Sequence, residues 1–336
     1  MSGAQVSDAV LAWLLAGDVA VRYQATRDLV GIDDLRLQAR IATEGDGAVL
    51  LAARGPSGHW GRGFYQPKWT SSHYTLLELR ELGCPRQTPA AVQTVQLVLD
   101  REFGGGAGMP RSTAAGDTCV VGMALNYAAW FGAAGEQLRP LVDFLLADQM
   151  PGGGFNCERN RTGVSHPALN TTVCVLEGIT SYRRAGHDYR RDDLDAARAG
   201  AAEVLLAHRL YRSHRTGEVI REDFTRLHHP ARWHYDVLRA LDALRDAGVP
   251  YDDRMDDALA LLDGRRMADG RWPVHRGYPG ETHLPVPRAG TAHPWTTLRA
   301  LRVRAAYPLD PRPPARTPGS PPRTTPAAPS PDPRRS

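Results

Sequence analysis

The sequence predicts an all-α fold, an α/α toroid in which about five helix hairpins form an inner and an outer ring. Three observations predict it. Long segments in which apolar residues recur with the period of a helix alternate with glycine-rich turns and polar loops. The runs of β-branched residues that would indicate a strand are absent. One helix of each pair, such as Thr118–Phe131 or Ala168–Tyr182, carries so few charges that it needs burial on most sides. The pairs are also spaced more widely than in most open solenoids, so we expect the ring to close.

The clearest hairpin spans Val142–Gly186. Its first helix, Val142–Gln149, is broken by a proline and three glycines that lead to Phe155. A polar loop containing His166 follows, and the second helix begins at Asn170. Four other pairs show the same order of helix, turn, loop and helix. Their expected helices are Gly47–Arg54 with Trp69–Leu82, Pro89–Phe103 with Asp117–Phe131, Asp193–Tyr211 with Pro230–Ala247, and Asp253–Arg266 with Pro294–Ala305.

Three shorter amphipathic segments precede the first pair, at Val6–Ala16, Asp18–Val30 and Asp33–Thr43. We assign them to an N-terminal helical extension over residues 1–46, and we assign the toroid domain to residues 47–306. Over 307–336 proline, serine, threonine and arginine dominate and no apolar face exists, so a disordered tail is expected. Its Pro-x-x-Pro spacings can dock a protein partner, although composition alone also produces them.

The composition excludes several classes of function. The net charge of +4 is small for 336 residues and the basic residues are scattered, so nucleic-acid binding is not expected. Charge interrupts each apolar run before it is long enough for a bilayer, so no membrane span is expected. Four cysteines and an N-terminus without a basic region or an apolar stretch predict reduced thiols and a cytoplasmic protein.

Three turns have the same spacing between a Gln or Arg at the end of an outer helix and a glycine and an aromatic residue in the turn that follows. They read Gln149-x-x-x-Gly153-x-Phe155, Arg54-x-x-x-Gly58-x-Trp60 and Arg266-x-x-x-Gly270-x-Trp272. A planar amide or guanidinium can stack on the aromatic ring and donate to carbonyls left open at the end of the outer helix. Glycine allows the tight turn.

This spacing, with Phe144 and Leu145 ahead of it, resembles the repeat motif of terpene cyclases. From about Gly47 to Ala305 the chain is therefore similar to the α/α-toroid superfamily of squalene and terpene cyclases and protein prenyltransferase β-subunits. More closely, it resembles bacterial proteins described as squalene-cyclase-like or prenyltransferase-like. The segments that carry this closer likeness are Trp13–Arg22, Gly154–Glu158, Thr171–Glu177, Arg232–Asp236 and Gly270–Pro273.

The resemblance implies a candidate zinc site. Protein prenyltransferases hold zinc on an Asp-x-Cys at the start of one inner helix and a His near the start of the next, which leaves one position open. Here Asp117 and Cys119 match the Asp-x-Cys, while Asn170 stands at the His position. His166, Cys174 and Cys157 are the candidates to replace that ligand. In the alternative interpretation Asp117 is a helix cap, the cysteines are small buried residues, and His166 is a loop residue.

Candidate catalytic groups are fewer. Class II terpene cyclases use an Asp-x-Asp-Asp acid, but Asp192–Asp195 and Asp252–Asp257 lack that pattern. Both segments lie at the starts of outer helices, where acids complement the helix dipole, so a squalene-type cyclisation is disfavoured. The best general acid or base candidates are Glu177 and Asp236, expected within inner helices, with His234 as a third.

Aromatic, histidine and polar residues are expected where the inner helices begin, around one mouth of the central cavity. Such a rim suits a large, partly apolar ligand. The predicted substrate-binding residues are Trp69, His73, Tyr74, Asn170, Arg232, Trp233, Tyr235, His293 and Trp295.

The leading hypothesis is a prenyltransferase- or terpene-cyclase-like toroid that binds a hydrophobic, isoprenoid-type ligand in a central cavity, with zinc-assisted transferase or cyclase chemistry. If it transferred prenyl groups to proteins, as the subunits it resembles do, it would need a separate α-subunit. Two alternatives stay open. One is a non-catalytic toroid that binds a ligand or a partner. The other is a carbohydrate-active (α/α) barrel with Glu177 and Asp236 facing each other about 5–10 Å apart.

Overall fold

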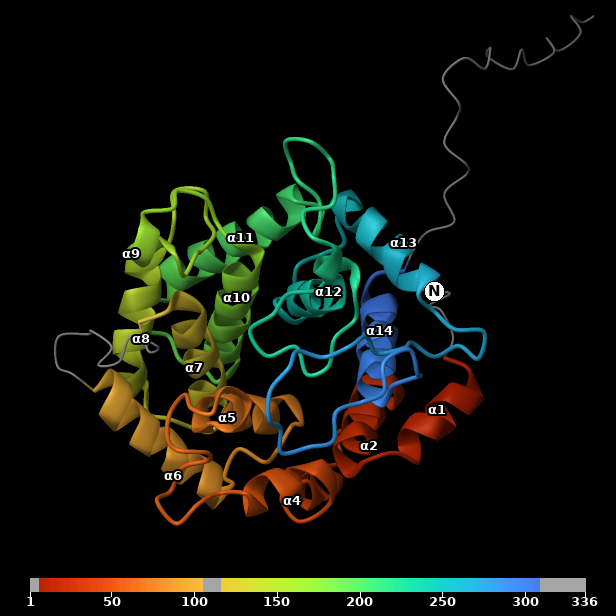
Figure 1. Cartoon of the computed structure of the whole chain (residues 1–336), viewed down its shortest axis with the longest axis horizontal. Coiled ribbons are helices and arrows are strands. Elements are labelled where there is room, and N and C mark those ends of the chain that lie inside the picture. The colour runs from red at the N-terminus through yellow and green to blue at the C-terminus, as the bar shows by residue number, and fades with distance from the viewer. Residues whose placement is uncertain (1–5, 105–115, 309–336) are drawn as a thin grey trace, which may run out of the picture.

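The computed structural model describes residues 6–104 and 116–308. Within these residues the chain is helical, with two isolated β-bridges and no strand. The helices form a closed, two-layered ring, an α/α toroid, which Figure 1 shows in face view. The predicted tail lies outside the described residues from position 309 onward, so its disorder and its role in binding a partner stay predictions.

The chain alternates between the two layers. The outer helices are α1 (Asp8–Leu15), α4 (Gly45–Ala52), α6 (Pro89–Val98), α8 (Gly135–Asp148), α11 (Arg191–Ala207) and α13 (Asp256–Gly264). The inner helices are α2 (Val19–Ala25), α5 (Ser72–Glu81), α7 (Thr118–Trp130), α10 (Leu169–Arg184), α12 (Val237–Asp246) and α14 (Pro294–Ala306). Short helices in the connections are α3 (Leu35–Arg40) and α9 (Arg159–Thr162). Single π-helical turns extend α2 and α6, over Thr26–Val30 and Leu99–Phe103, and 3₁₀ turns cover Lys68–Thr70, Glu222–Thr225 and Asp253–Met255.

The part of the chain that the structure describes contains six helix pairs rather than the expected five, because α1 and α2 form a pair of their own. Helix α2 lies between α14 and α5 (Figure 1). Arg302 of α14 donates to the side chains of Gln24 at 3.2 Å and Asp28 at 3.0 Å. Gln24 in turn donates to the backbone carbonyl of Glu81 at 2.7 Å. The N-terminal segment predicted to be an extension is therefore the link that closes the ring.

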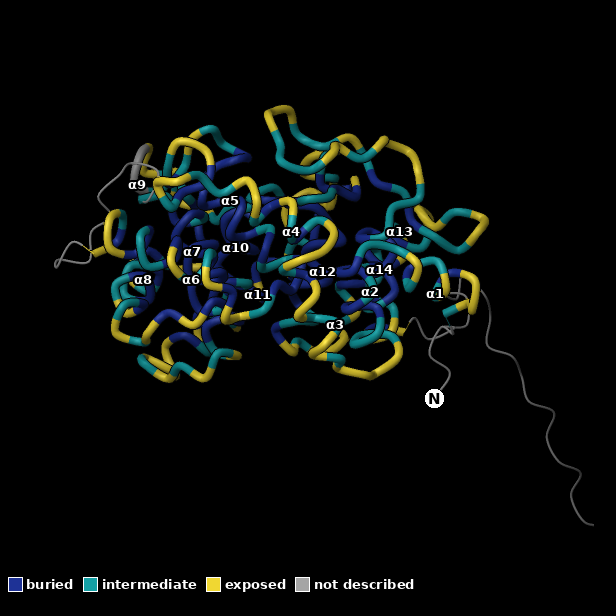
Figure 2. The backbone as a smooth tube through the Cα atoms, turned by 90° about the horizontal axis from the view of Figure 1, so that it is seen from below, coloured by how far each residue is buried: buried dark blue, intermediate teal, exposed yellow. Residues whose placement is uncertain are grey.

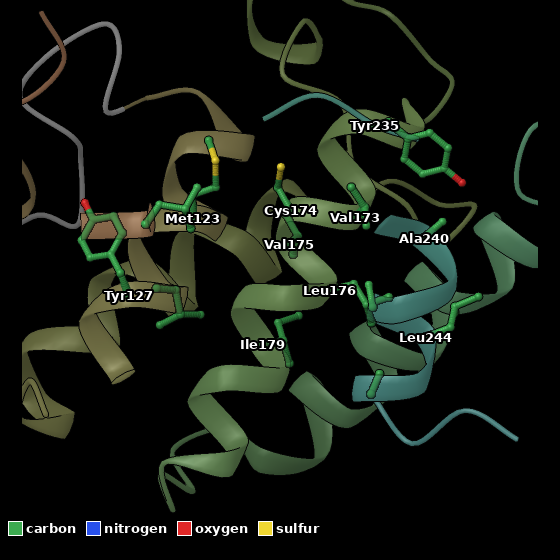
Figure 3. Close-up of a cluster of buried hydrophobic side chains, with 14 of the residues drawn as sticks. Met123, Tyr127, Val173, Cys174, Val175, Leu176, Ile179, Tyr235, Ala240 and Leu244 are labelled. Carbon is green, nitrogen blue, oxygen red and sulfur yellow. The ribbon is translucent and has the colours of Figure 1, made fainter. Parts of the chain in front are cut away.

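The inner helices are buried around most of their circumference because each packs against two inner neighbours and an outer layer. Figure 2 shows buried backbone through the middle of the ring and exposed backbone on the loops. In Figure 3, Met123 and Tyr127 of α7 and Ile179 of α10 belong to one apolar cluster that reaches Leu244 of α12. A Cβ at Gly178 would lie 2.3 Å from a backbone oxygen of α7, so α7 and α10 can approach closely only with glycine there.

The three turns predicted from their shared spacing have a common geometry. Their glycines have φ of 82°, 85° and 84°, a conformation that favours glycine. In each turn the first side chain donates to the carbonyl of that glycine: Arg54 to Gly58 (3.2 Å), Gln149 to Gly153 (2.9 Å) and Arg266 to Gly270 (3.2 Å).

The bonds at the end of the outer helix differ from the prediction. The open carbonyls accept hydrogen bonds from indole N–H groups. The indole of Trp60 donates to the backbone carbonyl of Leu50 at 2.6 Å, and that of Trp272 donates to the backbone carbonyl of Leu262 at 2.7 Å. The guanidinium of Arg266 lies 5.1 Å from the centre of the Trp272 ring, as the predicted stacking requires. Each of these two tryptophans therefore holds the last turn of an outer helix against its turn.

Helix α12 begins at Val237, later than the predicted start at Pro230. Arg232 has a φ of 57°, which no residue within an α-helix adopts. Asp236 is the N-cap, and its carboxylate accepts from the backbone N–H of Arg239 at 2.8 Å. Asp236 therefore lies before the helix, and the prediction that it lies within an inner helix is wrong.

Candidate functional site

Four aromatic side chains gather where two of the inner helices begin. Trp69 lies just before α5, Trp233 and His234 lie just before α12, and Tyr278 belongs to the loop before α14. They line one pocket of about 390 Å³, which we call the aromatic pocket. The other lining residues are Pro67, Lys68, Pro279, Gly280 and Glu281. Trp69 and Trp233, predicted as substrate-binding residues, and His234, predicted as a catalytic group, lie in this pocket, and their role in binding stays a prediction.

Long-range contacts hold the aromatic pocket together. The ring of His234 stacks between the rings of Tyr278 and Trp233. The indole N–H of Trp69 donates to the carbonyl of Pro279 at 2.7 Å, across 210 positions of sequence. A Cβ at Gly280 would lie 2.2 Å from the Trp69 ring, so only glycine lets the loop approach this closely. The loop before α14 thus forms one wall of the pocket.

Two cations border these rings. The Lys68 ammonium lies 4.9 Å from the centre of the Trp69 ring and 5.0 Å from that of Trp233. The Arg232 guanidinium lies 4.4 Å from the Trp69 ring, a cation–π geometry. Burial, followed by the charge of Lys68, lowers the pKa of His234 to about 3, so its ring is neutral at physiological pH. The pocket therefore offers mostly apolar faces with a positive edge.

The predicted catalytic carboxyls both have structural partners. Asp236 is 2% exposed and accepts from the backbone N–H groups of His228 at 2.9 Å and Arg239. Burial acts to raise its pKa, but the bonds from His228 and Arg239 outweigh this and hold the pKa below its usual range. Glu177 forms a two-pronged ion pair with the buried Arg239, at 2.9 and 2.7 Å. Neither carboxyl is available as half of the facing pair that a carbohydrate-active barrel requires.

The predicted metal ligands have different hydrogen-bond partners. The Sγ atom of Cys157 accepts from the backbone N–H of Cys119 at 3.1 Å, at the start of α7 next to Asp117. Cys174 instead contacts the guanidinium of Arg239 at 3.4 Å, and burial raises the pKa of its thiol to about 12. His166 is exposed in the loop before α10.

These residues therefore do not form the predicted ligand set. Among residues 6–104 and 116–308, no three His, Cys, Asp or Glu side chains form a group that could hold a metal ion. The residues that the sequence suggested as zinc ligands do not form a zinc site among the described residues. Zinc binding therefore stays a prediction.

The remaining predicted substrate-binding residues do not line the aromatic pocket. His73 hydrogen-bonds the hydroxyl of Tyr127 at 3.3 Å and is fully buried, and Tyr74 is buried beside it. Tyr235 is also a core residue, with its hydroxyl donating to the carbonyl of Leu210. The others lie elsewhere: Asn170 in the first turn of α10, and His293 and Trp295 at the start of α14 beside His229.

A second hollow of about 440 Å³ lies among the inner helices themselves, and we call it the charged cavity. All six inner helices, or the turns that follow them, contribute to its wall. Its ionisable lining residues are Arg27, Asp28, Glu78, Arg80, Glu81, Glu177, Arg184, His229, Asp242, Arg245, Asp246, Arg299 and Arg302. Asn126, Gln24, Trp130 and Trp295 complete most of the remaining surface.

Sequence reasoning missed several of these residues. Tyr278 lies in a long loop with no local pattern, so nothing in the sequence indicated that it meets His234. Glu78, Arg302 and Asp242 have the spacing of ordinary helix-surface charges. These residues line the cavity because each inner helix turns their face toward the centre of the ring. Apolar residues are spread around most of the circumference of these helices, so the sequence does not indicate which face points inward.

The described helices include none that is both long and apolar enough to cross a membrane. No protein-family model matches the sequence, and no curated protein matches it.

Some solved structures have a backbone arrangement similar to that of this chain, at low sequence identity. One is a glycosyl hydrolase family 88 protein from Bacteroides vulgatus, with a TM-score of 0.48 and 12% identity over 86% of this chain and 89% of that chain. Another is the type II terpene cyclase MstE from Scytonema in its apo form, with a TM-score of 0.31 and 16% identity over 82% and 98%. A variant of that cyclase in complex with geranylgeranyl dihydroxybenzoate gives a TM-score of 0.30 and 18% identity over 81% and 97%. No residue role passes from these proteins to this chain.

Proposed function

We propose that this chain is a ligand-binding toroid that takes a partly apolar small molecule of isoprenoid type in the aromatic pocket. The observation that supports it is the gathering of Trp69, Trp233 and Tyr278 around one hollow of about 390 Å³. That volume lies in the range of about 300–1,000 Å³ typical of small-molecule pockets. Aromatic faces bury large apolar area and interact well with unsaturated chains. Lys68 provides a charged edge for a polar end group.

The site of binding in this proposal differs from the one that the sequence predicted. A hydrophobic chain was expected in the centre of the ring, but the charged cavity occupies that position. Burying a hydrocarbon against arginines and carboxylates would remove their remaining hydration without replacing it. An isoprenoid would therefore bind in the aromatic pocket, next to the N-terminal ends of α5 and α12.

Binding rather than catalysis is the role that the side chains support. Asp236 caps α12, Glu177 pairs with Arg239, and the neutral His234 is held between two rings. A general acid or base needs a proton that it can exchange with the substrate, and none of the three is placed for that. Transferase or cyclase chemistry, with zinc or a separate subunit, remains the alternative.

Isothermal titration calorimetry with farnesol tests the proposal. Wild-type protein is expected to bind farnesol, and Trp233→Ala is expected to weaken binding about tenfold, because an aromatic contact contributes about 1.5 kcal/mol beyond its buried area. Trp13→Ala serves as the matched control, since Trp13 lies on the outer helix α1 and does not line the pocket. Its affinity for farnesol should equal that of wild type.

Dodecanol, a saturated alcohol of similar chain length, separates the chemical classes. Weaker binding of dodecanol than of farnesol supports an isoprenoid-type ligand. Equal binding of the two alcohols contradicts that part of the proposal. If Trp13→Ala and Trp233→Ala change the affinity for farnesol equally, the aromatic pocket is not the binding site.

A further inference from the structure

The arginines of the charged cavity are largely neutralised by carboxylates on neighbouring inner helices. Burial of an unpaired guanidinium is unfavourable, so these pairs stabilise the lining rather than attract a ligand. The ion pairs are Arg302 with Asp242 (2.7 Å) and Asp28 (3.0 Å), Arg245 with Asp242 (3.0 Å) and Asp246 (3.3 Å), Arg184 with Asp246 (2.7 Å), Arg299 with Asp242 (3.5 Å), and Arg27 with Asp28 (2.6 Å). Arg80 has no ion pair among the described residues.

Two carboxyl groups of the same lining are different. Glu78 and Glu81 lie one turn apart on α5, and neither carboxyl has a hydrogen bond or an ion pair with any residue that the structure describes. Burial raises the pKa of Glu78 to about 7. The charge of Arg232 opposes this rise, and the charges of Glu81 and Asp46 add to it. The α5 side of the cavity therefore has two carboxyl groups that lack a hydrogen-bonded partner among the described residues, with the charge of Arg232 acting on both.

Asn126 gives an independent indication that this hollow suits a polar ligand. It lies on α7, is 2% exposed, and lines the charged cavity. Its side-chain oxygen is buried and has no hydrogen-bond partner among the described residues. Buried polar atoms in proteins are nearly always bonded, so this oxygen is suited to accept from a bound molecule.

The Glu78 and Glu81 carboxyls and the Asn126 amide oxygen accept hydrogen bonds, and Nε of Arg80 and Nδ1 of His229 are further buried atoms of the lining without a hydrogen-bond partner among the described residues. A protonated amine has three donors and no acceptor, and so complements two carboxyls and an amide oxygen. The ring of Trp295, also in the lining, offers an aromatic face that attracts cations. An anion would instead have to approach Glu78 and Glu81, while most of the arginines are already paired.

We propose that the charged cavity binds a small aliphatic amine in its protonated form, held by Glu78, Glu81 and Asn126. This site is separate from the aromatic pocket, and no residue lines both. The chain would then carry two ligand sites in one ring, one for a partly apolar molecule and one for an organic cation.

Isothermal titration calorimetry with putrescine tests this proposal, and 1,4-butanediol, which has hydroxyls in place of the amines, is the uncharged comparison. Putrescine is expected to bind and butanediol is not. Glu78→Gln keeps the shape of the side chain and removes its charge, so putrescine affinity is expected to fall at least tenfold. Glu136→Gln is the matched control, because Glu136 lies on the outer helix α8 with its side chain 76% exposed.

The pH dependence provides a second readout. With a pKa of about 7, Glu78 is about one-tenth ionised at pH 6 and about nine-tenths ionised at pH 8, so affinity for putrescine should rise about tenfold over this range. The amines stay protonated throughout. Burial holds the pKa of His229 well below this range, so its ring stays neutral. The other charged groups near Glu78 or in the cavity wall are Glu81, Asp46, Arg232, Glu177, Asp242, Arg27, Asp28, Arg80, Arg184, Arg245, Asp246, Arg299 and Arg302.

In Glu78→Gln the rise in affinity with pH should disappear. Equal binding of butanediol and putrescine, an unchanged affinity in Glu78→Gln, or an absence of putrescine binding would overturn the proposal. Binding of inorganic phosphate that weakens with rising pH would identify an anion site instead. Thermal unfolding of each variant at both pH values separates lost binding from lost folding. Farnesol affinity should be the same in Glu78→Gln as in wild type, so the two sites can fail independently.

Discussion

Replacing Arg239 by methionine is expected to lower the free energy of unfolding by about 3–5 kcal/mol. The Arg239 side chain is 1% exposed, bonds both oxygens of Glu177, and donates to the carbonyl of His234 at 2.6 Å. Methionine fills much of the volume but leaves the Glu177 carboxylate without its cation and the carbonyl without a donor. Urea unfolding followed by far-ultraviolet circular dichroism measures the change.

A second arginine–glutamate pair provides the control. Arg40 and Glu44 also form two bonds, both at 2.7 Å, but their side chains are 45% and 46% exposed. Arg40→Met is therefore expected to leave the free energy of unfolding nearly unchanged, because solvent screens an exposed ion pair. Adding Glu177→Met to Arg239→Met should recover part of the loss, because no buried charge then remains unpaired. Equal effects of Arg239→Met and Arg40→Met would contradict the buried pair.

Trp272→Ala is expected to destabilise the protein by about 3–5 kcal/mol. The side chain of Trp272 is 1% exposed, and its indole N–H satisfies the carbonyl of Leu262 in the last turn of α13. Alanine leaves a cavity between the outer and inner layers and an unbonded carbonyl at the end of a helix. Thermal and urea unfolding of the variant measure the loss.

Trp272→Phe separates the two contributions. Phenylalanine keeps most of the buried area but lacks the N–H, so about 1–3 kcal/mol should be lost for the unbonded carbonyl of Leu262. If Phe and Ala destabilise equally, the hydrogen bond accounts for the whole effect and the packing argument is wrong. If Phe has no effect, the carbonyl of Leu262 does not depend on the indole.

The sequence predicted those parts of the fold that have a local signal. The spacing from Arg54 to Trp60 and from Arg266 to Trp272 specified both the turn and the pairing of an outer with an inner helix. The pair α1 and α2 lacks that spacing, since its connection is only Ala16–Asp18. It was therefore predicted as an extension, although its packing against α14 depends on contacts across the whole chain.

The candidate site was predicted less completely, for two physical reasons. Aromatic residues before α5 and α12 have a recognisable position, so Trp69 and Trp233 were expected in a pocket. The third wall comes from Tyr278, which no short-range pattern connects to them. The charge of the cavity also could not be read from the sequence, because a buried ion pair such as Arg302 with Asp242 joins residues 60 positions apart.

The closed ring is the central claim, and a double-mutant cycle between Arg302 and Asp28 tests it most directly. These residues are 274 positions apart in sequence and form an ion pair at 3.0 Å, where the last inner helix meets the first. Urea unfolding of Arg302→Gln, Asp28→Asn and the double variant gives their coupling energy, and Arg304→Gln with Asp28→Asn is the reference cycle, since Arg304 pairs with Asp263. A closed ring predicts a coupling of about 1–3 kcal/mol for Arg302 with Asp28 and additivity within about 0.5 kcal/mol for the reference. Additivity in both cycles would mean that the two ends of the chain do not meet, and the ring would be open.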